Sequence, residues 1–321
     1  MQLRSTLDSA IERLTAAGTG SPRLNGEVLL MFTLGCDRAY LYAHAERELS
    51  ADEHARYQSA LEERARGKPS QYITGHQEFW GLDFLVSPAV LIPRPETEHV
   101  IETVLELARS LPRPPRIVDV GTGSGCIALA LAKELPGAEI IAVDISAPAL
   151  EIARANAARL QLDQRVTFLE SNLLGALPAP SSLSAPFSIS APLGGKATRF
   201  EGPGPLAQPA QFDADSFDFV VSNPPYVGEA APEKVQREVR DFEPRVAVFA
   251  GESGMEVYRQ LIPQARERLE PGGWLVIEIG FSMEAAVRDL LAGWQEVRVT
   301  HDLQGIPRVV AARFASLAMS S

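Results

Sequence analysis

Residues 116–144 read RIVDVGTGSGCIALALAKELPGAEIIAVD, and this stretch decides the fold that the sequence predicts. It begins with RIVDVG, a short run rich in β-branched residues that is typical of a buried strand. SGCIALALAKEL then has the length and composition of a helix, and EIIAVD is a second buried strand. Further strands are predicted at VTFLES, FDFVVSNPPY, GGWLVIEIG, QEVRVTHD and PRVVAARF. This alternation predicts an α/β fold, a mainly parallel sheet with helices on both faces.

The chain before this stretch has a different pattern. Because its 321 residues exceed the size at which single cores usually stop growing, we expect more than one domain. Residues 1–70 repeat apolar residues at helical spacing and contain a capping-box pattern at Ser50-Ala51-Asp52-Glu53, so we predict a small helical bundle. Residues 71–95 mix aromatic residues with glycines and end in two prolines, which predicts a β-hairpin and an extended linker.

The remainder, residues 96–321, forms the predicted α/β domain, with one interruption. Residues 175–212 are rich in Pro, Ala and Ser, carry almost no charge and show no amphipathic period. We therefore predict a flexible insertion between two strands of the sheet.

The composition excludes several classes of protein. The net charge of −11 argues against a protein that binds nucleic-acid phosphates directly. Two cysteines and five scattered histidines offer neither a disulfide framework nor a metal site. The N-terminus lacks a signal-peptide pattern, and the longest apolar run, near residues 126–132, is far shorter than a membrane span of ~20 residues. We expect a cytoplasmic, monomeric protein without a metal.

A glycine-rich loop follows the first strand of residues 116–144 and opens the helix. Glycines at such a turn let the backbone approach a ligand closely. The spacing is GxGxG and Cys126 follows it, so the loop departs from the GxGxxG or GxGxxA fingerprint of dinucleotide-binding proteins. The next strand ends at Asp144, whose carboxylate can accept hydrogen bonds from both hydroxyls of a ribose. The predicted nucleoside-binding residues are therefore Gly121, Thr122, Gly123, Ser124, Gly125 and Asp144, and Asp119 is an acid two residues before the first of these glycines.

A second unusual turn ends a later strand, at residues 222–227 with the sequence SNPPYV. The Asn223 Oδ1 atom and the Pro224 carbonyl oxygen can accept the two N–H hydrogens of a planar NH₂ group. Pro225 stiffens the turn, and the Tyr226 ring offers a flat face. A planar amide or aromatic amine is a weak nucleophile, so orientation of its nitrogen matters more than a base. We predict that Asn223, Pro224 and Tyr226 are catalytic, and that with Pro225 they bind the substrate.

Together these motifs resemble the class I methyltransferases that use S-adenosylmethionine. The resemblance implies a Rossmann-like, seven-stranded sheet, with Asp119 near the methionine part of the cofactor and Asn223 facing its methyl group. It also implies that Asn172 and Leu173, after the third strand, lie at the adenine. The family usually has Asp where this chain has Asn172, and an amide can still bind the adenine edge.

NPPY occurs in methyltransferases of adenine N6 and of protein glutamine, and this motif alone does not separate them. Over nearly its whole length the chain resembles the peptide chain release factor N5-glutamine methyltransferases, the PrmC/HemK family. The segments that carry this resemblance are QYITGHQEFWGLDFLVSPAVLIPRPETE, DVGTGSG, AVDIS, VSNPPYV, FEPR at 242–245, GESG at 251–254 and HDLQGIPRVVAARF.

The resemblance implies S-adenosylmethionine-dependent methylation of the glutamine in the Gly-Gly-Gln motif of class I release factors, with the helical domain binding the factor. Two alternatives stay open: an adenine-N6 methyltransferase acting on DNA or RNA, and a non-catalytic protein that binds the cofactor or a release factor. A basic stripe beside the NPPY turn would favour the first of these, and the sequence shows none.

Overall fold

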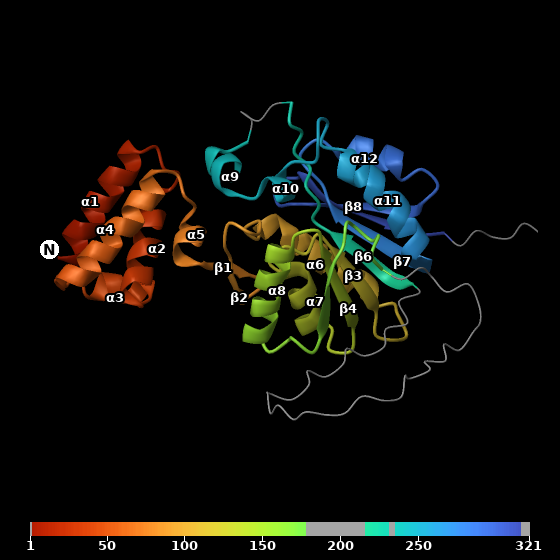
Figure 1. Ribbon diagram of the computed structural model, residues 1–321, viewed down its shortest axis with the longest axis horizontal. Helices are drawn as coiled ribbons and strands as arrows, with labels where there is room; N and C mark the ends of the chain where they lie inside the picture. The colour runs from red at the N-terminus through yellow and green to blue at the C-terminus, as the bar shows by residue number, and fades with distance from the viewer. Residues whose placement is uncertain (1, 178–215, 231–234, 316–321) are drawn as a thin grey trace, which may run out of the picture.

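The computed structural model describes residues 2–177, 216–230 and 235–315. Apart from residues 175–177, the predicted insertion at 175–212 lies outside this described part. Figure 1 shows a small helical domain set to one side of a larger α/β domain, with a short hairpin between them.

The helical domain is built from five helices around one apolar core. Leu3, Leu14, Leu29 and Leu61 are almost fully buried in it, in agreement with the helical spacing of the sequence. The predicted capping box is present, because Ser50 Oγ accepts a hydrogen bond from the Glu53 backbone and the Glu53 carboxylate accepts one from the Ser50 backbone. The helices are α1 (Leu3–Ala16), α2 (Pro22–Leu34), α3 (Arg38–Ala43), α4 (Ala51–Ala65) and α5 (Ser70–Thr74).

Two of these helices are short and were not expected. Helix α3 begins where Asp37 accepts a hydrogen bond from the Tyr40 backbone at 2.7 Å. Helix α5 lies across the predicted boundary between residues 70 and 71. Both helices are five or six residues long, too short for a hydrophobic period to reveal them in the sequence.

The predicted hairpin follows directly. Strands β1 (His76–Phe79) and β2 (Leu82–Leu85) pair antiparallel, and Trp80 and Gly81 form the turn with φ of 53° and 65°. The buried side chain of Asn156 binds both the N–H and the C=O of Leu85 and also the carbonyl of Ser124. Through this amide the hairpin is fixed to the loop that precedes helix α7 (Cys126–Glu134).

The α/β domain contains a seven-stranded sheet in the order β5-β4-β3-β6-β7-β9-β8. All its neighbouring strands are parallel except β9, which runs antiparallel to both β7 and β8. The strand order reverses between β3 and β6, so the carboxyl ends of these two strands flank the crevice where α/β proteins bind ligands. The strands are β3 (Arg116–Val120), β4 (Glu139–Asp144), β5 (Val166–Glu170), β6 (Phe217–Ser222), β7 (Leu269–Glu278), β8 (Gln295–His301) and β9 (Pro307–Arg313).

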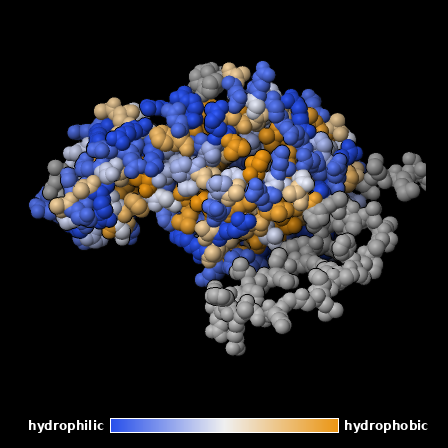
Figure 2. All heavy atoms as spheres, in the orientation of Figure 1, coloured by the Kyte–Doolittle hydropathy of each residue, from blue (hydrophilic) through white to orange (hydrophobic). Residues whose placement is uncertain are grey.

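Helices cover both faces of the sheet, as predicted (Figure 1). Ile117 of β3 faces the core beneath α6 and α7, whereas its neighbour Val118 faces the core beneath α11 and α12. The elements of this domain outside the sheet are η1 (Pro95–Thr97), α6 (Glu98–Ala108), α7 (Cys126–Glu134), α8 (Ala147–Arg159), α9 (Arg237–Phe242), α10 (Arg245–Val248), α11 (Glu256–Arg268) and α12 (Glu284–Leu290). In the space-filling view, hydrophobic side chains gather mainly on the α/β domain, and the helical domain is mostly hydrophilic (Figure 2).

Helix α9 connects the two domains. The Arg64 side chain of α4 is 4% exposed and forms an ion pair with Glu238 of α9. The same guanidinium donates to Asn25 Oδ1 at 2.7 Å and to the Lys68 carbonyl at 3.1 Å. One buried cation therefore joins helices α2 and α4 to the α/β domain.

Replacement of this cation tests its contribution to stability. We expect Arg64→Met to lower the free energy of unfolding by about 2–4 kcal/mol, because Glu238 and Asn25 both lose their partner. Urea unfolding followed by circular dichroism measures the change. Arg66→Met is the matched control, since the side chain of Arg66, the residue that caps the C-terminus of the same helix, is 76% exposed and its ion pair with Glu62 is 4.0 Å long. Equal unfolding midpoints for the two variants would contradict this role for Arg64.

Candidate active site

The glycine loop lies between β3 and α7 and needs backbone conformations that favour glycine. Gly121, Gly123 and Gly125 have φ of 73°, 56° and 83°. A Cβ atom on Gly121 or Gly123 would meet no atom within 4 Å, whereas one on Gly125 would lie 3.1 Å from Leu129 Cδ1. The first two glycines thus leave open space beside the loop, and the third lets the helix pack closely.

Asp144, at the end of β4, supports this loop from the neighbouring strand. One carboxylate oxygen accepts a hydrogen bond from the Gly123 backbone at 2.8 Å, and the other accepts one from the Ser146 backbone at 2.9 Å. Burial raises the pKa of the Asp144 carboxyl, and these backbone N–H groups act in the opposite direction. Each oxygen keeps one lone pair for a further donor.

Asp119 lies behind the loop and is completely buried. Its Oδ2 atom accepts hydrogen bonds from the Thr122 hydroxyl at 2.6 Å and the Ala128 backbone at 3.3 Å. Burial raises the pKa of this carboxyl to about 7. Its Oδ1 atom and the Ser124 Oγ atom of the glycine loop are both buried without a hydrogen-bond partner in the part of the chain that the structure describes.

The Asn-Pro-Pro-Tyr turn begins where β6 ends, beside the glycine loop. The Ser222 hydroxyl donates to the Val120 carbonyl at 2.7 Å and so ties the end of β6 to the end of β3. The next residue, Asn223, donates from Nδ2 to Thr97 Oγ1 at 3.0 Å. Its Oδ1 atom is therefore the part of the amide left for another donor.

Glycines from two later loops position Tyr226. A Cβ atom on Gly280 would lie 2.8 Å from the ring carbon Cδ2 of Tyr226, and one on Gly254 would overlap the Tyr226 carbonyl oxygen. The Tyr226 hydroxyl donates to Glu278 Oε1 at 3.5 Å, and burial raises its pKa well above the usual value. Gly254 belongs to the GESG segment that the sequence singled out, so this segment supports the backbone of the turn.

A cavity of about 470 Å³ brings most of the predicted residues together. The ones that line it are Gly121, Thr122, Gly123, Ser124, Asp144, Asn172, Leu173, Asn223 and Pro225. Asp119, Gly125, Pro224 and Tyr226 are not among its lining residues. Both Asp119 and Pro224 are buried.

Sequence reasoning missed several polar residues that line the cavity, which are Thr97, Ser146, Ser171, Glu256 and Gln260. Thr97 lines the cavity, and its hydroxyl donates to Glu278 Oε2 at 2.6 Å. Glu78, Arg94 and Glu96, from the hairpin, the linker and the residue after it, do not line the cavity. Arg94 instead forms an ion pair with Glu243, the acidic residue of the FEPR segment. Thr97 lies in η1, two residues beyond the end of the predicted linker at residue 95.

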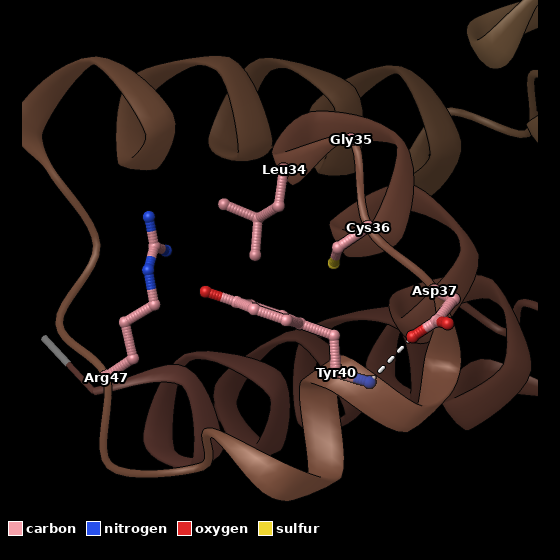
Figure 3. A pocket seen from close by; sticks show the side chains of 6 residues that line it. All are labelled: Leu34, Gly35, Cys36, Asp37, Tyr40 and Arg47. Atoms are coloured by element: carbon pink, nitrogen blue, oxygen red, sulfur yellow. Dashed lines mark hydrogen bonds between the residues drawn. The ribbon is translucent and has the colours of Figure 1, made fainter.

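A second hollow lies in the helical domain, away from the predicted site residues (Figure 3). Figure 3 shows the ring of Tyr40 lying across it. The charged side chains that line it make their contacts within the helical domain, because Asp37 caps α3 and Arg47 pairs with Glu53 at 2.7 Å. The lining residues are Leu34, Gly35, Cys36, Asp37, Tyr40 and Arg47.

Searches of the described residues for two other kinds of site gave no candidate. None of the helices placed by the structure has the length and apolar character needed to cross a membrane. Within the same residues, no group of three or more His, Cys, Asp or Glu side chains could hold a metal ion.

Comparison with known proteins assigns the chain to a family. Its sequence matches the family models of the PrmC N-terminal domain at residues 5–75 and of a methyltransferase domain at residues 117–194. It is 52% identical to the release factor glutamine methyltransferase of Koribacter versatilis, over 98% of this chain and 99% of that protein. The chain belongs to the release factor glutamine methyltransferase family. The family proteins of Geobacter sulfurreducens (38% identity, 97% of this chain, 96% of that one) and Moorella thermoacetica (40%, 97% and 98%) are also similar.

Solved structures agree with the predicted fold class. The crystal structure of the hMettl16 catalytic domain in complex with the MAT2A 3'UTR hairpin 1 covers 86% of this chain and 85% of that one, with a TM-score of 0.51. At 18% identity this likeness concerns the fold alone. Together with the family assignment, it confirms the predicted Rossmann-like methyltransferase fold and the predicted family.

The buried carboxyl of Glu278 makes stability depend on pH. Burial raises its pKa to about 7, with Glu96 acting in the same direction and with Thr97, Arg308 and Tyr226 opposing the shift. Between the usual glutamate pKa and pH 7 the folded state binds more protons than the unfolded state, so stability decreases as pH rises through this window.

We therefore expect Glu278→Gln to lose less stability than the unmodified protein between pH 5 and pH 8, by roughly 1–3 kcal/mol. Urea unfolding at each pH gives the values. Glu139→Gln is the control, since the Glu139 side chain is 62% exposed. Parallel pH curves for Glu278→Gln and the unmodified protein would show that this carboxyl does not titrate in that range.

Proposed function

We propose that this protein transfers a methyl group from S-adenosylmethionine to the side-chain amide nitrogen of the glutamine in the Gly-Gly-Gln motif of class I peptide chain release factors. Relatives named release factor glutamine methyltransferase, similar over nearly the whole chain, support this substrate. The observation that carries the chemistry is the orientation of Asn223, because its Nδ2 is bound to Thr97 and its Oδ1 remains for an acceptor NH₂ group.

The cavity fits a nucleoside cofactor with a charged amino-acid part. Asp119 Oδ1 and Ser124 Oγ are buried polar atoms without partners, as expected where a ligand supplies the missing donors and acceptors. Open space beside Gly121 and Gly123 admits a ligand against the backbone. When bound, S-adenosylmethionine supplies a methyl group on a positively charged sulfur.

The residues that would hold this cofactor follow from their positions and from the family resemblance. Asp144 keeps lone pairs for the ribose hydroxyls, and the exposed Ile145 beside it offers an apolar contact for the adenine. Asn172 and Leu173 line the same cavity and complete the adenine site in this proposal. Asp119, Thr122 and Ser124 would bind or support the methionine part from the glycine loop.

Asn223, Pro224 and Tyr226 act on the acceptor. Asn223 Oδ1 and the Pro224 carbonyl accept the two N–H hydrogens of the glutamine amide, which fixes the direction of its nitrogen lone pair. These hydrogen bonds strengthen as positive charge develops on that nitrogen, so they favour the transition state over the ground state. Pro225 keeps the turn rigid, and the Tyr226 ring supports the plane of the amide.

The alternative of adenine-N6 methylation has less support, because the family assignment favours a protein acceptor and the net charge is −11. A binding protein without activity is also less favoured, since the polar groups that would orient an NH₂ group are intact. Binding of the release factor by the helical domain, a cytoplasmic location and a monomeric state stay predictions.

Methyl transfer from radiolabelled S-adenosylmethionine tests the proposed substrate. We expect label on a class I release factor and none on the same factor with its Gly-Gly-Gln glutamine replaced by alanine, nor on mixed DNA and RNA. Label on nucleic acid alone would contradict a glutamine acceptor. Bound cofactor with no transfer to any of the three would favour a binding protein.

Asn223→Ala tests the proposed holder of the NH₂ group. We expect kcat to fall by at least about 10²-fold, because the main acceptor for the NH₂ group is removed. The dissociation constant of S-adenosylmethionine, measured by calorimetry, should change little. Gln164→Ala removes an exposed amide elsewhere and should keep the normal rate. A near-normal rate for Asn223→Ala would refute the assignment.

A further inference from the structure

A buried carboxyl at the end of β7 begins a chain of hydrogen bonds that leads to Asn223. Glu278 is 3% exposed and Thr97 is 2% exposed. Glu278 Oε2 accepts a hydrogen bond from Thr97 Oγ1 at 2.6 Å, and Thr97 Oγ1 accepts one from Asn223 Nδ2 at 3.0 Å. The three side chains come from β7, η1 and the turn after β6, so the tertiary fold alone brings them together.

These hydrogen bonds run in one direction, from Asn223 to Thr97 and from Thr97 to Glu278. A threonine hydroxyl has a single hydrogen, and in Thr97 that hydrogen goes to the carboxyl of Glu278. The Thr97 oxygen can then only accept a hydrogen bond from Asn223. The amide must present Nδ2 to Thr97, and Oδ1 consequently faces away from it.

Of the two side-chain hydrogen bonds that the Glu278 carboxylate accepts among the described residues, the one from Thr97 is the shorter. The Tyr226 hydroxyl donates to Oε1 at 3.5 Å, and the Tyr258 hydroxyl donates to the backbone carbonyl of Glu278 at 2.9 Å. Arg308 is engaged with Asp302 at 2.8 Å and with Glu96 at 3.5 Å. In the described part of the chain, the ion pairs formed within 4.0 Å do not include Glu278.

We propose that Thr97 and Glu278 are positioning residues that fix the orientation of the Asn223 amide, so that its Oδ1 atom is presented to the acceptor NH₂ group. The proposal rests on the proposed function and adds two residues that act through Asn223. When the carboxyl is protonated at Oε1, which faces the Tyr226 hydroxyl, Oε2 remains an acceptor for Thr97 and the direction of these hydrogen bonds is kept.

Loss of the Thr97 hydroxyl would leave the amide free to turn. In the turned state Nδ2 would face the NH₂ group of the substrate, and two donors would oppose each other. Binding of the release factor depends on a much larger surface and would be little affected. The expected result is therefore a change in kcat and not in KM.

Two substitutions at position 97 and one at a matched position test this proposal. Thr97→Val keeps the shape and should lower kcat about ten-fold, while Thr97→Ser keeps the hydroxyl and should stay within about three-fold of the normal rate. KM for the release factor and the cofactor dissociation constant should stay unchanged in both. Thr103→Val is the control, because the Thr103 hydroxyl binds the His99 carbonyl and Thr300, outside the site, and its rate should not change.

The outcomes separate a positioning role from a structural one. A Thr97→Val rate within about two-fold of normal would overturn the proposal. So would a loss of rate that is matched by an equal loss of cofactor affinity, or an equal loss in Thr97→Ser.

A second measurement keeps the proposal independent of the substrate. The side-chain amide signals of Asn223 in a ¹⁵N–¹H NMR spectrum report the hydrogen bond to Thr97 in the protein alone. They should shift in Thr97→Val and not in Thr103→Val. If the unmodified protein transfers no methyl group to glutamine, the proposed function fails, and these signals still decide the orientation of Asn223. Unchanged signals in Thr97→Val would overturn it.

Discussion

The adjacency of strands β3 and β6 is the constraint on which the site depends. They are parallel neighbours in the sheet, and their carboxyl ends lie at the same edge. The hydrogen bond from Ser222 to the Val120 carbonyl holds these ends together at the last residue of each strand. The glycine loop and the Asn-Pro-Pro-Tyr turn both begin one residue later. Their separation is therefore set by the spacing of two strands, which is among the least variable distances in a protein.

Buried polar groups then refine this arrangement. Asp119, Asp144 and Glu278 are carboxyls whose pKa values are raised by burial, and all three lie near the edge where these strands end. Removing a carboxyl from water is unfavourable, so each is held by donors from loops that converge on the site. Burial of these carboxyls lowers the stability of the fold. Each donor has a fixed direction, however, and therefore holds its carboxyl in one orientation. Two further atoms, Asp119 Oδ1 and Ser124 Oγ, have no hydrogen-bond partner among the described residues, which is consistent with a ligand that completes the set.

Much of this architecture could be predicted from the sequence because the periodic elements are long and regular. The seven strands, helix α7 and the capping box at Ser50 all follow from local patterns. So did the glycine loop, Asp144 and Asn223, since each directly follows a strand. The predicted limits of the domains stay predictions, and the predicted insertion falls almost wholly outside the described residues.

What could not be predicted depends on tertiary contacts. Thr97 reaches Asn223 across 126 residues of sequence, and Glu278 is 181 residues from Thr97. In the sequence, Thr97 resembles an ordinary residue of a helix start, and Glu278 resembles a polar residue in a strand. Arg64 and Glu238 likewise belong to different domains, and neither local segment indicates the other. Such pairs become visible only when the sheet order is known.

The glycines around Tyr226 have a consequence for how such a site is recognised. Gly254 and Gly280 contribute no functional group, yet any side chain at either position would collide with the tyrosine. The observed position of Tyr226 thus requires that residues 254 and 280 have no side chain. An inventory of reactive groups would pass over both residues, although a single added methyl at either one would displace the turn. The geometry of the candidate site therefore depends partly on two positions that carry no side chain.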